Sequence, residues 1–316
     1  MRQQWSEIAP TANSIENNYS FLKGELDRAA ASNKQVSLIV SWAGKAVPAW
    51  VTANGVPTYS YVNPNEFQPD FGATITVPAS WDAGYAGEVS RFVAALGAAT
   101  SSHPALQIVN THCVSASSPD WFLPINSPEN IQLLKDKGFT ADAQFAACRT
   151  IVDATMRAFP NQVITMAFGQ LPQSLTGQRD GDFLARQIID YVRQSWPTRR
   201  FYAMRWNLNT VVPDPRTVAS VTGGWGLMNE QQTNIADQIF TAAQWVWPAS
   251  DIGTCRANGN RSPCDAVTNL AGPGDVAVNG YGMRYLEVYG ADVTNPSLSA
   301  ALTAIADAIR ARFGGT

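Results

Sequence analysis

Short apolar stretches alternate with longer segments of helical periodicity along the whole chain. The stretch 36–42 (VSLIVSW) is nearly continuously apolar and β-branched, which is typical of a parallel strand covered on both faces. Further strands are predicted at 106–112, 163–168, 201–207, 225–228 and 283–289, after a short first strand at 3–5. Amphipathic helices are predicted at 19–31, 85–99, 141–159, 183–196, 234–247 and 297–313. The pattern therefore predicts a strand followed by a helix, repeated from end to end.

The repeat of strand and helix favours a barrel of parallel strands. The pattern contains seven strand–helix units, whereas a closed barrel has eight. Because no shift in composition divides the chain, we expect one α/β domain over 1–316, a (β/α)8 TIM barrel that lacks its first strand or has an atypical one. A doubly wound open sheet is the alternative, although no glycine-rich phosphate loop follows an early strand.

Three long loops are predicted, at 43–81, 115–139 and 251–281. They leave from the carboxyl ends of strands or from the segments just beyond, and this is the face on which barrels carry their active sites. The first loop is rich in aromatic residues, among them Tyr59, Tyr61, Phe67 and Trp81. We therefore expect a walled groove at this face.

Composition narrows the choice of partner and location. With a net charge of -3 and scattered basic residues, the chain lacks the positive electrostatic field that would attract nucleic acid. No apolar run reaches the roughly 18 to 20 residues that span a membrane, and the opening does not resemble a signal peptide. Only 15% of residues are charged and ten are tryptophans, a balance that suits a secreted or periplasmic protein with a weakly charged surface. Oligomeric state stays open.

Four cysteines occur without any Cys-x-x-Cys spacing, which argues against zinc and thioredoxin-type chemistry. No metal and no cofactor is expected. Two disulfides are the favoured interpretation over reduced, buried thiols, with a local bridge between Cys255 and Cys264 across a Gly/Asn/Pro loop.

Carboxylates near the ends of late strands are the candidate catalytic groups. Hydrolysis of a glycosidic bond needs one carboxylic acid to protonate the leaving oxygen and a second carboxylate to attack or to activate water. Glu287 ends a predicted strand, Glu230 follows another, and Asp120 lies on the loop after the strand that ends at His112. Each has a structural alternative: a buried ion pair for Glu287, the first turn of a helix for Glu230 and a turn for Asp120.

Sugar rings stack on flat aromatic surfaces and bond to amides and carboxylates, so aromatic and amide side chains at strand ends are candidate ligand contacts. Packing is the alternative for each tryptophan taken singly. The predicted substrate contacts are Trp42, Trp50, His112, Trp121, Arg205, Trp206, Asn207, Trp225 and Tyr289. A Ser-His-Asp esterase, with Ser115 or Ser117, His112 and Asp120, is a further alternative that no spacing selects.

The first third of the chain carries a family resemblance. The segment 4–10 (QWSEIAP) precedes a predicted helix, and the segment 34–40 (KQVSLIV) is followed by 48–51 (PAWV) and by Trp81-Asp82. These segments resemble the second and third strand regions of clan A glycoside hydrolases, the (β/α)8 retaining enzymes that include β-galactosidase-like and cellulase-like families. The resemblance implies a barrel whose first strand is absent from the sequence, in agreement with the strand count.

The resemblance also implies positions for the two catalytic groups. Clan A enzymes carry an Asn-Glu pair after the fourth strand, whose Glu is the acid/base, and a nucleophilic Glu at the seventh. Here Asn110 matches the Asn, but Thr111 stands in place of the acid. Glu230 matches the nucleophile, with Glu287 on the next strand. Two functions follow: a hydrolase acting on a β-linked polysaccharide or oligosaccharide, or a carbohydrate-binding pseudoenzyme.

Overall fold

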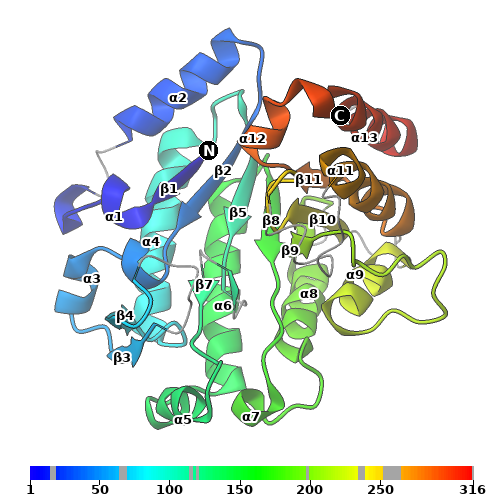
Figure 1. Ribbon diagram of the computed structural model, residues 1–316. Coiled ribbons are helices and arrows are strands. Elements are labelled where there is room, and N and C mark those ends of the chain that lie inside the picture. The colour runs from blue at the N-terminus through cyan, green and yellow to red at the C-terminus, as the bar shows by residue number, and fades with distance from the viewer. Residues whose placement is uncertain are drawn as a thin grey trace. The chain divides into compact units, whose positions relative to one another are not determined.

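The computed structural model describes residues 1–14, 19–63, 70–113, 117–118, 121–196, 199–233, 239–251 and 265–314 (Figure 1). These residues belong to two compact units, Met1–Trp196 and Pro197–Thr316. The expectation that a single barrel domain spans 1–316 stays a prediction. None of the described helices combines the length and the apolar character needed to cross a membrane.

The first unit is built on four parallel strands: β1 (Arg2–Gln4), β2 (Val36–Ser41), β5 (Leu106–Thr111) and β8 (Val163–Ala167). Strand β2 pairs with β1 on one side and with β5 on the other, and β5 pairs with β8. The helices that follow the strands are α1 (Trp5–Ile8), α2 (Ser20–Ala31), α4 (Ala83–Thr100), α6 (Ala141–Ala158) and α8 (Phe183–Ser195). The predicted alternation, including the short first strand, is confirmed in this unit.

Helices α4 and α6 lie side by side along the sheet (Figure 1). Helix α4 begins after Asp82, whose carboxylate accepts a hydrogen bond of 2.9 Å from the backbone N–H of Tyr85. The apolar stripe predicted for this helix is confirmed, because its members are at most 1% exposed: Val89, Phe92, Val93 and Leu96. The two helices approach so closely at Gly97 that a Cβ atom there would lie 2.5 Å from the carbonyl oxygen of Ala158.

The excursion 43–81 has structure of its own. It contains α3 (Ala49–Ala53) and an antiparallel hairpin of β3 (Thr58–Val62) and β4 (Thr74–Pro78). Tyr59 stacks on Trp81 with ring centroids 5.4 Å apart, and Trp81 meets Phe139 edge-on at 5.2 Å. Tyr61 lies 6.0 Å from Tyr59, and burial raises its pKa to about 12. The expectation that these rings wall a groove is wrong, since they form a small core; Phe67 lies outside the described residues.

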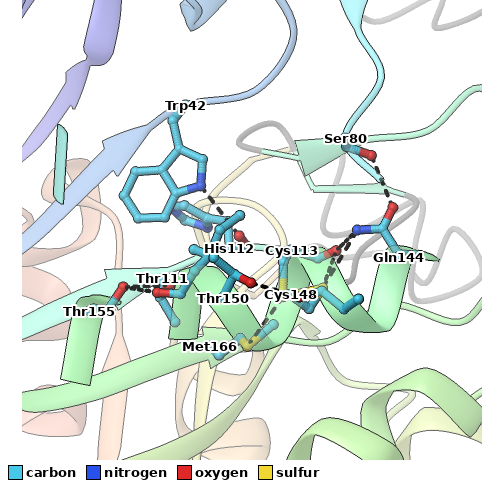
Figure 2. The surroundings of a disulfide bond; sticks show 12 residues. Trp42, Ser80, Thr111, His112, Cys113, Gln144, Cys148, Thr150, Thr155 and Met166 are labelled. Atoms are coloured by element: carbon cyan, nitrogen blue, oxygen red, sulfur yellow. Dashed lines mark hydrogen bonds between the residues drawn. A yellow bond between two sulfur atoms is a disulfide. The ribbon is translucent and has the colours of Figure 1, made fainter. Parts of the chain in front are cut away.

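A disulfide fastens the end of β5 to helix α6 (Figure 2). It joins Cys113 to Cys148, and both residues are at most 1% exposed. The Gln144 side chain donates to the carbonyl oxygen of Cys113 at 3.0 Å and accepts from the Ser80 hydroxyl at 3.0 Å. One of the two expected disulfides is therefore present, whereas Cys255 and Cys264 lie outside the described residues. The excursion 115–139 also contains β6 (Ser117–Ser118), β7 (Trp121–Phe122) and α5 (Pro128–Asp136), and α7 (Gln173–Thr176) follows β8.

The second unit contains three parallel strands, β9 (Phe201–Leu208), β10 (Phe240–Trp245) and β11 (Tyr285–Glu287), with β10 in the middle. Its described helical elements are α9 (Gly223–Thr233), α11 (Ala266–Asp275), a π-helical turn (Val276–Gly280), α12 (Gly290–Val293), a short 3-10 turn (Pro296–Leu298) and α13 (Ser299–Phe313). Across the described residues of both units, seven parallel strands alternate with helices. The predicted α/β fold, one strand short of a closed (β/α)8 barrel, is confirmed.

Two predicted elements of this unit are wrong. The expected strand at 225–228 belongs to helix α9, and the expected helix at 234–247 contains strand β10. Short apolar runs such as WGLM have no period that distinguishes a buried strand from a buried helix. Part of the predicted loop 251–281 is helix α11, whereas the last predicted helix, at 297–313, is found as α13.

Candidate functional site

Strands β9, β10 and β11 have one face covered by helices. Arg205 of β9 points toward α9, because a Cβ atom on Gly224 would lie 2.3 Å from the Arg205 guanidinium carbon. Trp245 of β10 points toward α11, where its indole N–H donates to the carbonyl oxygen of Asn269 at 3.2 Å. Since side chains alternate along a strand, the neighbours of Arg205 and Trp245 lie on the other face.

Trp206, Gln244 and Glu287 form a row on that other face, at the carboxyl ends of the three strands. Gln244 stands in register with Glu287, so their side chains share a face. All three side chains are half-buried. The Tyr285 hydroxyl donates to a carboxylate oxygen of Glu287 at 2.7 Å, which fixes the orientation of the carboxylate. The row offers a flat indole, an amide and an oriented carboxylate, a set that matches the faces and hydroxyls of a sugar.

A β-bulge interrupts β9 within this row. Arg205 pairs with Ala243 and Leu208 with Trp245, so two residues of β9, Trp206 and Asn207, stand against one residue of β10. Bulges re-aim side chains and are frequent next to active sites. The Oδ1 atom of Asn207 is buried and has no hydrogen-bond partner among the described residues. Because buried polar atoms are normally bonded, an amide oxygen without a described partner is unusual.

A charged cluster holds the loop that follows β9. The Arg216 guanidinium bonds to Asp214 at 2.7 Å and to Asp275, at the end of α11, at 2.6 Å. The Tyr281 hydroxyl donates to the carbonyl oxygen of Pro213 at 2.6 Å. The hydrogen bonds from Arg216 lower the pKa of both carboxyl groups, Asp214 and Asp275, below the usual range. This cluster fixes the loop after β9 to helix α11 of the same unit.

Arg216→Gln is expected to lower the free energy of unfolding by about 1 kcal/mol at pH 7, the usual scale for exposed ion pairs. Because the folded-state pKa values of Asp214 and Asp275 lie below their unfolded values, this contribution is present above about pH 4 and is lost as the pH falls further. Urea unfolding of both proteins at pH 7 and pH 3 measures it. A difference that stays constant across this range contradicts the prediction. Arg310→Gln, which removes an exposed pair with Asp307 on α13, is the control.

Glu230 and Glu287 lie on different elements of the second unit. Glu230 is exposed in the last turns of α9. Its neighbour Gln231 lines a pocket with Phe240, the first residue of β10, whereas Glu287 aligns with Gln244 four residues further along. Four residues of strand span about 13 Å, more than the 5 to 9.5 Å that separates catalytic carboxyl groups. The structure therefore does not support Glu230 as the partner of Glu287. Asp120 lies outside the described residues.

Two predicted residues of the first unit are buried. Trp42 is 1% exposed and His112 is 2% exposed, with their rings 5.1 Å apart (Figure 2). The Trp42 indole donates to the carbonyl oxygen of His112 at 3.3 Å. Such burial assigns both rings to packing and removes the support for the esterase alternative, whose Ser115 and Asp120 lie outside the described residues.

The Asn-Thr pair at the end of β5 is also internal. The Asn110 amide donates to the hydroxyl of Thr165 on β8 at 2.9 Å. The Thr111 hydroxyl lies 3.2 Å from that of Thr155 on α6, so Thr111 faces the helix (Figure 2). Thr111, which the resemblance aligns with the acid, is therefore a packing residue.

The remaining predicted contacts have structural partners. The Trp50 indole donates to the carbonyl oxygen of Ala9 at 2.9 Å, and its ring meets Trp5 edge-on at 5.7 Å. Trp225 lies on α9 with its ring 5.2 Å from that of Tyr281. The Tyr289 hydroxyl donates to the carbonyl oxygen of Val246 at 3.0 Å. Trp121 belongs to β7, and its side chain is not described.

Gln244 and Tyr285 are the members of the row that the sequence prediction missed. Gln244 lies within FTAAQW, a run for which the pattern predicts a helix and the structure has strand β10. A single polar residue near the end of an apolar strand is the signal that identifies it once the strand is recognised. Tyr285 lies two residues before Glu287, the spacing that places both side chains on one face of a strand.

No protein family model matches the sequence, and no curated protein does. Among solved structures, the chain is similar to β-galactosidase from the psychrophilic Marinomonas ef1, with 11% identity over 90% of this chain and 48% of that chain at a TM-score of 0.48. It is also similar to endo-glycoceramidase II from Rhodococcus sp., with 12% identity over 97% and 61% at 0.40, and to M tuberculosis LpqI, with 12% over 91% and 79% at 0.42. The chain thus spans about half the length of the β-galactosidase.

Proposed function

We propose that this protein binds carbohydrate at the carboxyl ends of β9, β10 and β11, through Trp206, Gln244 and Glu287. The observation that carries the proposal is the row itself: an indole, an amide and a carboxylate oriented by Tyr285 on one face of adjacent strands. Neighbouring strands lie about 4.8 Å apart, so the row extends over about 10 Å, enough to contact one or two sugar rings. β-linked oligosaccharides are the expected ligands, in keeping with the family that the opening resembles.

Binding without hydrolysis is favoured over hydrolysis. A glycosidase needs two carboxyl groups on opposite sides of the bond that it cleaves. In the row Glu287 is the one acidic member, and the clan A acid position carries Thr111, which contacts Thr155. These features support the pseudoenzyme interpretation.

Hydrolysis is the second candidate, because Glu287 is a carboxylate at a strand end whose orientation is fixed by a tyrosine hydroxyl. Under this alternative Glu287 attacks the sugar or activates water. Release of reducing sugar from a panel of β-glucosides, β-galactosides and β-linked oligosaccharides distinguishes the two functions. Turnover that is lost in Glu287→Gln but kept in Glu230→Gln establishes hydrolysis.

Glu287→Gln is expected to weaken oligosaccharide binding by about tenfold or more, because a hydrogen bond to a charged acceptor is worth about 1.5 to 3 kcal/mol. Titration calorimetry with soluble β-linked gluco- and galacto-oligosaccharides measures the affinity. Glu230→Gln is the matched control, since Glu230 is an exposed glutamate of the same unit outside the row, and its affinity should equal that of the wild type. Absence of binding to every member of the panel, or equal loss in both variants, refutes the site.

The proposed location is outside the cytoplasm. The buried disulfide between Cys113 and Cys148 is typical of proteins in oxidising compartments. The weakly charged composition also suits a secreted or periplasmic protein. A secreted or periplasmic protein would meet polysaccharides there.

A further inference from the structure

A groove separates helices α2 and α4 of the first unit, and its volume is about 1010 Å³. One wall comes from the start of α2, and the floor comes from one face of α4. That floor consists of four alanines: Ala94, Ala95, Ala98 and Ala99. Because residues three and four apart are neighbours on a helix surface, their methyl groups form one apolar strip. The groove belongs to the first unit, whereas the proposed carbohydrate site belongs to the second.

The alanine strip lacks the charged side chains that the neighbouring helix α6 carries on its outer face. Ala94 and Ala98 are exposed, yet the segment 92–100 (FVAALGAAT) contains no charged residue. Helix α6 has exposed arginines instead, Arg149 and Arg157. A helix that is apolar on all sides is normally buried. The alanine strip is therefore suited to contact with another protein surface.

Helix α2 carries an exposed aromatic ring on the side away from the groove. Phe21 is 55% exposed, whereas Leu22 is 1% exposed and packs into the unit. Ser20 and Lys23 line the groove. Successive residues of an α-helix are turned by about 100°, so Phe21 and Lys23 point to nearly opposite sides of α2. The helix thus has the groove on one side and a protruding phenylalanine on the other.

The charged groups that line the groove are basic. They are Lys23 and Arg91, and the described lining contains no aspartate or glutamate. Arg91 already has partners, because its guanidinium bonds to Glu88 at 2.7 Å and lies over the ring of Trp50 at 5.5 Å. Lys23 is exposed and has no ion pair among the described residues. Lys23 is therefore the cation at the groove that can pair with an acid of a second molecule.

An acid lies on the same side of α2 as Phe21. Glu25 follows Phe21 by four residues, the spacing that places two side chains on one face of a helix. Its carboxylate pairs with Arg28, one turn further along. Exposed pairs of this kind contribute little to stability, and a carboxylate has two oxygens, so Glu25 can also accept from a second cation. The two sides of α2 are thus complementary in shape and in charge.

We propose that two copies of this chain associate through α2, with Phe21 of each protomer in the groove of its partner. Rotation by 180° about an axis through the outer edge of α2 exchanges its two sides, so both contacts form at once. Glu25 of each protomer then faces Lys23 of its partner. Gly24 lies between the two sides, and no atom approaches within 4 Å of its Cβ position, so the two helices can come close there. Both Phe21 and the alanine strip are covered in this dimer.

Sedimentation equilibrium over a range of protein concentrations tests this interface. The wild type should form a dimer that dissociates on dilution. Phe21→Ser should weaken the dimer by about tenfold or more, because a few buried aromatic side chains carry most of the affinity of an interface. Phe71→Ser is the matched control, since Phe71 is 60% exposed in the same unit and does not line the groove. Its dimer should be as stable as that of the wild type.

Ala98→Glu is the second variant, because it places a carboxylate on the floor of the groove. It should give a monomer whose thermal unfolding stays cooperative, since position 98 is exposed in the single chain. Thr150→Glu, which introduces the same charge at an exposed position of α6, is its control and should leave the dimer intact.

Lys23→Glu should weaken the dimer, and adding Glu25→Lys in the same chain should restore it by exchanging the charges of the pair. A wild type that is monomeric at every concentration overturns the proposal, as does a dimer that Phe21→Ser and Ala98→Glu leave intact. Equal weakening by Phe21→Ser and Phe71→Ser also overturns it. Failure of Glu25→Lys to restore the dimer of Lys23→Glu overturns the pairing of these two residues.

Discussion

Replacing Cys113 and Cys148 together by alanine is expected to lower the free energy of unfolding by about 4 kcal/mol. The disulfide closes a loop with a sequence separation of 35 residues, and the chain-entropy relation gives about 4 kcal/mol for a loop of this length. Urea unfolding of the variant and the wild type, followed by far-UV circular dichroism, measures the change. Because the bond joins β5 to α6, the loss should fall on the first unit.

As a control, the measurement is repeated with Cys255 and Cys264 replaced by alanine, both in the protein that keeps Cys113 and Cys148 and in the variant that lacks them. In that background no other thiol can pair with a freed cysteine. Both sulfur-bearing residues are buried, so the native protein should also resist dithiothreitol until urea begins to unfold it. A change below about 1 kcal/mol on removing the cysteines would contradict the predicted role of the bond.

Gly97→Ala is expected to destabilise the protein by about 2 to 3 kcal/mol, the cost of adding a methyl group to a tightly packed contact. The new Cβ atom would lie 2.5 Å from the Ala158 carbonyl oxygen and 2.6 Å from its Cβ atom. One of these is backbone, so α4 and α6 must separate for the methyl group to fit. Thermal and urea unfolding measure the effect.

Gly87→Ala on the same helix is the matched control. Gly87 is exposed and has no atom within 4 Å of its Cβ position, so only the backbone propensity changes. Alanine there should stabilise the protein by about 0.5 to 1 kcal/mol, because glycine is a poor helix former. Equal effects at the two positions would show that α4 and α6 are not in close contact at Gly97.

The parts of the fold that could be predicted are those with a clear period. The stripe of Val89, Phe92, Val93 and Leu96 on α4 and the apolar run of β2 leave one interpretation each, and both are found. The second unit was harder, because WGLM in α9 and FTAAQW in β10 are short and apolar without a decisive period. There the tertiary surroundings select helix or strand, and the sequence of one segment does not contain that information.

The prediction of a strand at WGLM also explains why the predicted position of Glu230 is wrong and that of Glu287 is right. Glu287 ends a strand that was predicted as such, and it lies in the row with Trp206. The apolar run WGLM predicts a strand that ends just before Glu230, whereas Glu230 is an exposed residue of α9. The sequence pattern also does not predict how deeply a side chain at a strand end is buried. Trp42 and His112 both follow strands, and both are buried.

The contact between Thr111 and Thr155 constrains the redesign of this chain. A glutamate at position 111 would place a carboxylate in the closed layer between β5 and α6, where an ionised group is costly. Introducing an acid at the end of β5 therefore requires α6 to change in the same step.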